Sequence, residues 1–396
     1  MNDPEQSICP ICDREHTDVF FRLGKVPAHI GLLWTSRERA RACSRGEIRL
    51  AACQGCGFVY NQAFDLARLE YSEAYDNSLH FSDVYQEYAH GVAQRLVETY
   101  GLRGKSIVEI GCGKGDFLVL LCDLGDNCGF GFDPSYDGRQ QEEVSARRIT
   151  FVKDFYSESH ADYPADLIVS RYVFEHIPEP LLFLKTIREV IGSRLDMVVY
   201  FEVPNLLFTL RDHSIWDIIY EHCSYFSPSS LARVFCQAGF EILELREQYD
   251  GQFLGIVARP AAPGAGPSQN GWGNPEEVSG RVPGFAEEYR RQLESWGARL
   301  EEMTASKRRV VLWGGGAKGV SFLNFLGIEE AVSHVVDINP AKQGKHIAGT
   351  GQRIVAPEEL PYLGPDVVIL MNPVYRDEVR ASCRELGIEP EILCAL

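Results

Sequence analysis

The chain has 396 residues, 45% of them hydrophobic, a length that fits two or three domains of roughly 150 residues with buried cores. Its formal charge is −17, from 56 acidic against 39 basic residues, which argues against sequence-independent binding to nucleic-acid phosphates. No run approaches the roughly 20 apolar residues that cross a bilayer, so we expect no membrane partner. Twelve scattered cysteines without a signal peptide predict a cytoplasmic protein with thiols rather than disulfides.

The segment from residue 1 to 70 contains two C-x2-C pairs, Cys9 with Cys12 and Cys53 with Cys56. Each short loop turns two thiolates toward one point, which suits a tetrahedral Zn²⁺ and predicts a zinc-binding domain. Four cysteine ligands leave no open position, so we expect the zinc to be structural and to supply folding free energy. The possible substitute ligands are Cys43, His16 and His29. The alternative is four thiols without a metal.

Aromatic and polar residues dominate the next segment, from residue 70 to 88. Its rings are Tyr71, Tyr75, His80, Phe81, Tyr85 and Tyr88. We expect a loop and short helices that lead into the core domain and can cover its ligand. Core packing is the alternative for any single ring, and Tyr75 is the ring that we expect at the site.

A glycine-rich turn follows the apolar run at residues 107–110. The pattern is E-x-G-x-G-x-G, made of Glu109, Gly111, Gly113 and Gly115. A helix begins at Phe117, and a strand, a tight turn and a helix N-terminus together are typical of a nucleotide-like ligand site in an α/β domain. Asp116 stands where the dinucleotide pattern G-x-G-x-x-G has its third glycine. The alternative is an ordinary βα turn with incidental glycines.

This turn resembles motif I of the class I S-adenosylmethionine (SAM) methyltransferases. The resemblance implies that the glycines let the backbone approach the methionine part of SAM, where a Cβ would collide. It also implies an acidic residue at the end of the next strand that binds the adenosine ribose. Asp133 ends the apolar run at residues 129–133 and is the residue that we expect there.

Strand and helix signals alternate from residue 90 to 259, which predicts a doubly wound parallel sheet with ligands at the carboxyl ends of its strands. Asp154 ends one strand, where the resemblance implies a contact with adenine, and Arg171 ends the next strand. Both are predicted to bind the cofactor. Glu175 and His176 lie in an E-H-I-P turn that is common in class I methyltransferases, and we expect them to shape the floor of the site.

Glu221 and His222 lie in an aromatic segment at residues 216–227. A carboxylate beside an imidazole raises the basicity of the ring, and histidine changes its charge near neutral pH, so the pair predicts a general base. The alternative is a packed histidine that is hydrogen-bonded to a nearby backbone group. Ser229 is the predicted N-cap of the helix that follows.

A linker rich in proline and glycine spans residues 260–284, and a charged amphipathic helix is predicted at residues 285–307. We expect this helix to brace the domains on either side of it.

A second nucleotide-like pattern follows the helix. A strand at residues 309–313 precedes Gly314–Gly319, which fits G-x-G-x-x-G, and Asp337 ends the next strand. About four strands fit before the last residue, which is half of a Rossmann domain. Three roles stay open: binding of NAD(P), binding of a substrate phosphate by the glycine loop and Lys318, or a purely structural role.

The order of these segments resembles the zinc-containing sugar C-methyltransferases of deoxysugar biosynthesis over nearly the full length. The resemblance implies a class I SAM methyltransferase core with an α/β Rossmann-like fold at residues 71–259. It implies a zinc-binding domain at residues 1–70, a linker and helical arm at 260–307, and a smaller Rossmann-like domain at 308–396. The implied substrate is a nucleoside-diphosphate-linked 4-keto-6-deoxysugar, methylated at C3. The oligomeric state stays open.

The pattern around the base of that family is Y-x-E-H. Glu221 and His222 match its last two positions, whereas Ile219 stands in place of the tyrosine and Tyr220 follows one position later. The segment Tyr75–Ser78 also departs from the Tyr-His-Ser-Ser run of the family. These departures concern the substrate more than the fold or the cofactor.

The residues fit carbon methylation through an enolate. A carbon next to a ketone is acidic enough for an imidazole to deprotonate it, so His222 is the predicted base and Glu221 its orienting and charge-compensating partner. A hydroxyl group of Tyr75 or Tyr220 is the predicted donor to the enolate oxygen. The alternatives are methylation of an oxygen or nitrogen atom, and a catalytically idle zinc-knuckle scaffold. The intact glycine turn and Asp133 argue against the scaffold.

Overall fold

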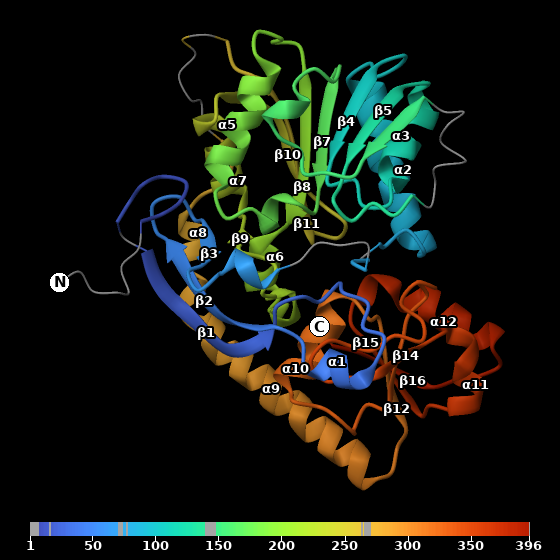
Figure 1. Ribbon diagram of the computed structural model, residues 1–396. Helices are drawn as coiled ribbons and strands as arrows, with labels where there is room; N and C mark the ends of the chain where they lie inside the picture. The colour runs from blue at the N-terminus through green and yellow to red at the C-terminus, as the bar shows by residue number, and fades with distance from the viewer. Residues whose placement is uncertain are drawn as a thin grey trace.

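The computed structural model describes residues 8–15, 17–69, 74–76, 78–138, 148–262, 264 and 271–395. Strands of these residues form three sheets, with seven, four and five members. The seven-stranded sheet occupies the upper part of Figure 1, and the two smaller sheets lie below it. None of the described helices combines the length and the hydropathy that crossing a membrane requires.

The seven-stranded sheet has the strand order that is typical of class I SAM methyltransferases. Its strands, in order across the sheet, are β10 (Phe240–Gln248), β11 (Phe253–Pro260), β8 (Val198–Pro204), β7 (Leu167–Arg171), β4 (Ser106–Ile110), β5 (Cys128–Phe132) and β6 (Ile149–Val152). β11 pairs antiparallel with both of its neighbours, while the other pairs are parallel. The predicted fold of this part is confirmed.

Helices cover both faces of this sheet, as its buried apolar strands require. One core lies under α2 (Asp83–Thr99) and α3 (Asp116–Gly125), and the other lies under α5 (Pro180–Ile191) and α7 (Pro228–Gln237). Figure 1 shows the two pairs on opposite sides of the strands. Ser227, rather than the predicted Ser229, caps α7, because its side chain accepts a hydrogen bond from the backbone N–H of Ser230.

The short elements between these strands lie at the carboxyl ends of β6, β7 and β8. They are η2 (Glu158–His160), η3 (Phe174–His176), α6 (Leu206–Arg211) and η4 (Ile215–Asp217). This is the edge at which α/β sheets bind ligands, because the loops there are free of sheet pairing.

The four-stranded sheet is antiparallel and takes its last strand from the middle of the chain. Its members, in order, are β1 (Thr17–Pro27), β2 (Arg45–Cys53), β3 (Val59–Asn61) and β9 (Ser224–Tyr225), with α1 (Arg37–Arg41) and η1 (Leu66–Arg68) in its connections. β9 comes directly after the Glu221-His222 pair. Its pairing with β3 therefore joins the N-terminal segment to the loop that carries the predicted base.

A long helix, α9 (Val282–Ala305), follows the short α8 (Glu276–Ser279) and fulfils the prediction of a helix at residues 285–307. Figure 1 shows α9 running along β1 toward the C-terminal sheet. Near its start, the ring of Phe285 lies 5.2 Å from that of Phe21 on β1. Farther along, Trp296 lies 5.3 Å from Phe322 of the C-terminal domain. The contacts at both ends fit the predicted bracing role.

The C-terminal sheet is parallel and has five strands, where the sequence indicated about four. Their order is β14 (Arg353–Val355), β13 (His334–Val336), β12 (Val310–Trp313), β15 (Val367–Leu370) and β16 (Glu391–Cys394). The helical elements around it are α10 (Ala317–Phe325), η5 (Pro357–Glu359), α11 (Leu360–Leu363), η6 (Pro373–Tyr375) and α12 (Arg376–Glu385). The strand order reverses between β12 and β15, which places a nucleotide-type crevice at their carboxyl ends.

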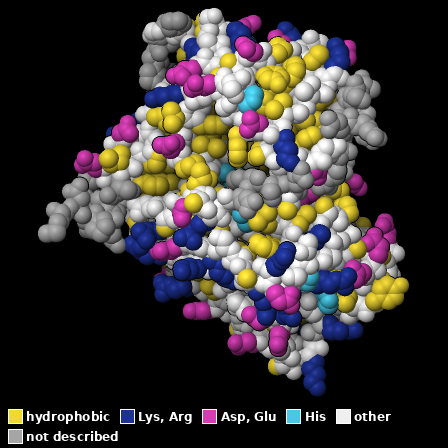
Figure 2. Space-filling model, in the orientation of Figure 1, with side chains coloured by type: hydrophobic (Ala, Val, Ile, Leu, Met, Phe, Trp, Pro, Cys, Tyr) yellow, Lys and Arg dark blue, Asp and Glu magenta, His cyan; other side chains and the backbone are white. Residues whose placement is uncertain are grey.

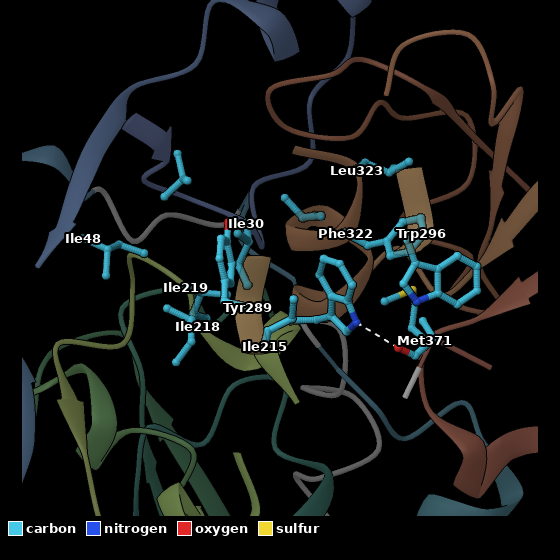
Figure 3. Packing of buried hydrophobic residues seen from close by; sticks show 14 of the residues in the cluster. Ile30, Ile48, Ile215, Ile218, Ile219, Tyr289, Trp296, Phe322, Leu323 and Met371 are labelled. Atoms are coloured by element: carbon cyan, nitrogen blue, oxygen red, sulfur yellow. Dashed lines mark hydrogen bonds between the residues drawn. The ribbon is translucent and has the colours of Figure 1, made fainter. Parts of the chain in front are cut away.

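One hydrophobic core joins the N-terminal sheet, the η4 segment, α9 and the C-terminal domain. Figure 3 shows part of it, with Ile215 and Ile219 beside Tyr289 of α9 and Phe322 of α10. The indole N–H of Trp216 also donates to the carbonyl of Ala395 at 3.0 Å. The four predicted domain ranges stay predictions: residues 71–259 and 308–396 each have a hydrophobic cluster of their own, and the cluster described here joins several of the ranges.

Candidate active site

The predicted SAM turn lies between β4 and α3, and each of its three glycines has a positive φ. A Cβ added at Gly111 would lie 2.1 Å from Val173, whereas one added at Gly113 would meet nothing within 4 Å. Gly113 also lines a large cavity. Its Cα therefore faces open space that a ligand can fill, and the predicted contact with the methionine part of SAM stays a prediction.

Asp133 follows β5 and is held beside the glycine turn. One carboxylate oxygen accepts the backbone N–H of Gly113 at 2.8 Å, and the other accepts the N–H and hydroxyl of Ser135 at 2.7 and 2.6 Å. Asp133 lines the cavity, so its carboxylate is available to a ligand from that side. Asp154 also lines the cavity, at the end of β6.

Glu109 and Arg171 lie deeper, at the ends of β4 and β7, and both also line the cavity. Burial raises the pKa of Glu109 to about 8, and its Oε2 has no hydrogen-bond partner among the described residues. The Arg171 guanidinium lies 3.0 Å from Glu202 Oε1 and 4.1 Å from the ring centroid of Phe117. Arg171 thus belongs first to a buried ion pair under the glycine turn. Its contact with the cofactor stays a prediction.

The cavity has a volume of about 1120 Å³ and connects three parts of the chain. It runs from the glycine turn past the loop of Glu221 and His222 to the Gly314–Gly319 loop of the C-terminal domain. Hydrophobic side chains gather along the boundary between the upper and lower parts of the molecule in Figure 2. The polar residues of the glycine turn and of these two loops thus line one mostly apolar cavity, of the kind that binds small molecules.

Glu221 does not contact His222, which corrects the predicted pairing. Its Oε1 accepts from the backbone N–H of Ile30 at 2.7 Å and lies 2.9 Å from His29 Nδ1, while its Oε2 accepts the hydroxyl of Tyr75 at 3.1 Å. Glu221 lies in a turn with Tyr220, and its side chain points toward the N-terminal segment. Although burial opposes ionisation, the His29 hydrogen bond and the neighbouring histidines lower the pKa of this carboxyl.

His222 faces Glu175 and His176 instead. Its Nε2 lies 4.0 Å from Glu175 Oε1, and its ring centroid lies 5.0 Å from that of His176. Burial lowers the pKa of His222 well below its ordinary value, and the nearby His176 and Lys318 lower it further. The ring is therefore neutral at pH 7 and can accept a proton.

The two candidate tyrosines differ in their location. The hydroxyl of Tyr75 points at Glu221 and lines the cavity. Tyr220 lies outside the cavity lining: its hydroxyl donates to the carbonyl of Asp65 at 3.3 Å and accepts the N–H of the same residue at 2.8 Å. The predicted role of Tyr220 as a donor to the substrate does not fit this placement, because Asp65 engages its hydroxyl and its ring packs over Gly46.

The four predicted zinc ligands meet at one point. The sulfur atoms of Cys9 and Cys56 lie 3.6 Å apart, those of Cys12 and Cys53 lie 3.5 Å apart, and all four lie within 4.8 Å of one another. Zn–S bonds of about 2.3 Å in a tetrahedron need similar sulfur separations, so the residues fit a zinc ion. None of the four lines the cavity, which fits a structural ion.

The substitute ligands named from the sequence do not join this cluster. His29 is bound to Glu221 at the active site, and Cys43 packs in the core shared with the C-terminal domain. His16 lies outside the described residues.

The C-terminal glycine loop opens into the same cavity, and its acidic residue is held by backbone N–H groups as Asp133 is. Asp337 accepts the N–H groups of Gly315 and Asn339, both at 2.8 Å, and lies 3.6 Å from Lys342 Nζ. Lys318 pairs with Asp217 of η4 at the cavity wall. The glycine loop and the ion-paired ammonium group of Lys318 thus face the cavity from this side.

Two residues near the base were missed or undervalued in the sequence. His29 has no signal, because it reaches Glu221 only through the folding of the N-terminal segment. Glu175 was assigned to the floor of the site, and its location beside His222 depends on the contact between η3 and the loop before β9. A local pattern cannot report either contact.

Two parts of the chain match models of known protein families. Residues 82–245 match a family model described as a methyltransferase domain, and residues 279–389 match one described as a C-methyltransferase C-terminal domain. The chain is 26% identical over 310 residues to C-methyltransferase NovU of Streptomyces niveus. The alignment covers 72% of this chain and 70% of NovU.

Two solved structures show a limited likeness. The 1,6-didemethyltoxoflavin-N1-methyltransferase of Burkholderia thailandensis is 15% identical, with a TM-score of 0.35 over 46% of this chain and 82% of that one. The magnesium protoporphyrin IX methyltransferase of Synechocystis PCC 6803 is 15% identical, with a TM-score of 0.36 over 45% of this chain and 84% of that one.

Proposed function

We propose that this SAM-dependent methyltransferase methylates the carbon beside the ketone of a nucleotide-linked keto-deoxysugar. The domain matches and the likeness to NovU support transfer of the methyl group to carbon. The observation that carries the proposal is the single cavity that joins the glycine turn, His222 and the C-terminal glycine loop. A cavity of about 1120 Å³ has room for a cofactor and a second, elongated molecule.

The glycine turn and the strand ends around it hold the cofactor in this proposal. Gly113 leaves space for the methionine part, and Asp133 and Asp154 offer carboxylates to the ribose and the adenine. Bound SAM would supply an electrophilic methyl group on a sulfonium ion.

His222 is the proposed base. A neutral imidazole in the cavity can take a proton from the carbon next to a ketone, and the electron pair of the C–H bond then forms an enolate. The lowered pKa of His222 keeps the ring neutral at pH 7, with a lone pair free to accept a proton, but it also makes the ring a weaker base. His222 lies in the same cavity as the glycine turn, which favours attack of the enolate carbon on the methyl group through orientation.

Tyr75 is the proposed donor to the enolate oxygen. Its hydroxyl lines the cavity and donates its one proton to Glu221, whose other oxygen accepts the N–H of Ile30, so this proton would turn from Glu221 to the substrate oxygen. A hydroxyl held at this place can stabilise the negative charge that develops on the enolate oxygen. Glu221 is accordingly proposed to position Tyr75 rather than His222.

The C-terminal domain is proposed to bind the nucleotide end of the substrate. Its glycine loop and Lys318 face the cavity, and an ammonium group and backbone N–H groups are the donors that phosphates require. The C-terminal sheet has five strands and is smaller than the two-part sheet of a full dinucleotide-binding domain, which favours the substrate role over NAD(P).

A screen with methyl-labelled SAM tests the proposal. The purified enzyme would be incubated with dTDP- and UDP-linked 4-keto-6-deoxyglucose, and NMR would locate the label in the product. We expect the label on the carbon next to the ketone, C3. A label on an oxygen atom would overturn the proposal in favour of O-methylation, and absence of transfer to any nucleotide-linked keto sugar would remove this substrate class.

A further inference from the structure

Glu175 is placed beside the proposed base by two backbone contacts. After β7, Tyr172 takes a left-handed conformation with φ 59°, and the chain turns into η3. The carbonyl of Glu175 then accepts the N–H of Cys223 at 3.0 Å, and His176 Nδ1 lies 3.0 Å from the carbonyl of Glu221. These contacts lock the Glu175-His176 turn against the loop that carries His222.

The Glu175 carboxyl group is buried and incompletely paired. Its side chain is 2% exposed and lines the cavity, and its Oε2 has no hydrogen-bond partner among the described residues. A buried carboxylate without partners is costly, so a group in this state needs an explanation. The neighbour that can supply a partner is His222, whose Nε2 lies 4.0 Å from Oε1.

Other carboxylates near His222 are already committed. Both oxygens of Glu221 have partners on the N-terminal segment and Tyr75, and Asp217 is paired with Lys318. Within the described residues, Glu175 is the acid with an oxygen as close as 4.0 Å to a ring nitrogen of His222.

We propose that Glu175 is the positioning residue of His222, the role that the sequence assigned to Glu221. This inference rests on the proposed role of His222 as the base. The ionised carboxylate accepts a hydrogen bond from His222 Nε2–H and so leaves the lone pair of Nδ1 for the substrate. Hydrogen bonds of catalytic groups are often long before the substrate binds, and a small rotation of either side chain closes the 4.0 Å gap.

The protons balance in this arrangement. The C–H bond of the substrate breaks, its electron pair forms the enolate, and its proton goes to Nδ1 while Nε2 keeps its own proton. The imidazolium that results is then paired with the carboxylate of Glu175. A protonated Glu175 would instead donate to Nε2 and favour the tautomer with a hydrogen on Nδ1, which cannot accept the substrate proton.

The protonation state of Glu175 should therefore determine which tautomer of His222 is present at a given pH. Burial raises the pKa of Glu175 to about 8. The groups that face this pair are Glu202 and Cys223 near the carboxyl, and His176, Tyr225 and Lys318 near the ring. Because the ionised acid is the competent form, the competent tautomer should increase as pH rises through about 8.

Nitrogen NMR of the enzyme with bound S-adenosylhomocysteine tests this without a substrate. Histidine would be ¹⁵N-labelled, and His222 assigned from the signal that His222→Ala removes. We expect wild type to shift toward the Nε2–H tautomer between pH 7 and 9, and Glu175→Gln to lose the shift. The exposed Glu179→Gln is the matched control and should behave as wild type. An unchanged tautomer shift in a folded Glu175→Gln variant would overturn the proposal.

Kinetics with the sugar that is active in the label screen separate this inference from the proposed function. Glu175→Gln should lower kcat about 10- to 100-fold and flatten its rise with pH, with little change in KM. If His222→Ala is inactive while Glu175→Gln keeps the wild-type rate and pH profile, the role of Glu175 is refuted and the base stands. If His222→Ala is fully active, the proposed base itself is refuted.

Discussion

The sequence was least informative about single side-chain contacts, such as which carboxylate contacts which histidine. The Glu221 and His222 side chains were predicted to pair, yet they point to different neighbours. Glu221 reaches back to His29, and His222 reaches forward to Glu175. Pairings of this kind depend on tertiary contacts between segments that lie far apart in the chain, so adjacency in the sequence does not predict them.

His222→Ala should lower kcat on the order of 10²- to 10⁴-fold and leave SAM affinity nearly unchanged, because proton abstraction occurs in the transition state. Single-turnover kinetics and calorimetry with SAM would measure the two effects. His176→Ala is the internal control, since its ring lies 5.0 Å away in the same cluster. A collapse of activity in His176→Ala together with a near-normal His222→Ala would move the base to the earlier histidine.

Whole elements were predicted more successfully than contacts. The glycine turn, the alternating strands and helices, and α9 follow from periodicity and turn chemistry, which are local. The short strands β9 and β16 were not predicted, because so few residues carry no usable period. The cysteine spacing predicted a metal site, and the sulfur atoms do converge. The presence of zinc itself stays a prediction.

Gly113→Val should abolish SAM binding, because the new side chain would enter the open space of the cavity and the backbone has a φ of 54°. Gly101→Val is the matched control: its φ is 63°, it also meets nothing within 4 Å, and it lies outside the cavity lining. Calorimetry with SAM compares the two variants. Equal affinities would refute the assignment of the turn.

Asp133→Ala should weaken SAM binding by about 1–3 kcal/mol, since a ribose hydroxyl and the N–H of Gly113 lose their acceptor. The exposed Asp162→Ala serves as the control. SAM affinity that is unchanged in Asp133→Ala would place the ribose elsewhere.

About one zinc per chain should be found by elemental analysis, as four converging thiolates require. Cys53→Ser should reduce the zinc content and lower the melting temperature, whereas Cys128→Ser, outside the cluster, should change neither. A protein that is folded and active without metal would contradict the structural role.

At the scale of the whole molecule, the parts are less independent than their sequence patterns indicate. The N-terminal sheet, α9 and the C-terminal domain share one core, and all three sheets border the loops around the cavity. Each pattern was recognisable in isolation, but the cavity exists only where the parts meet. A local sequence pattern does not predict contacts between distant parts of the chain. The residues that line both ends of the cavity could therefore be named only from the structure.

Lys318→Met tests the contribution of the C-terminal domain more sharply than removing the domain, which would expose the shared core. The variant should raise KM for the nucleotide-linked sugar and weaken binding of free dTDP or UDP, while SAM affinity stays the same. The exposed Lys185→Met is the control. Unchanged nucleotide affinity in Lys318→Met would argue for a structural domain, and tight NAD(H) binding would revive the dinucleotide site.

The location of β9 in the N-terminal sheet has a consequence for how the protein is made. While the ribosome synthesises the chain, β1, β2 and β3 emerge long before the strand that completes their sheet. The edge of β3 stays open until residues 224 and 225 leave the exit tunnel. His222, the proposed base, precedes that strand by two residues, so the same event that closes the nascent sheet also fixes the position of the His222 loop. An N-terminal fragment released early would carry an unpaired edge, and assembly of the active site is the step that protects it.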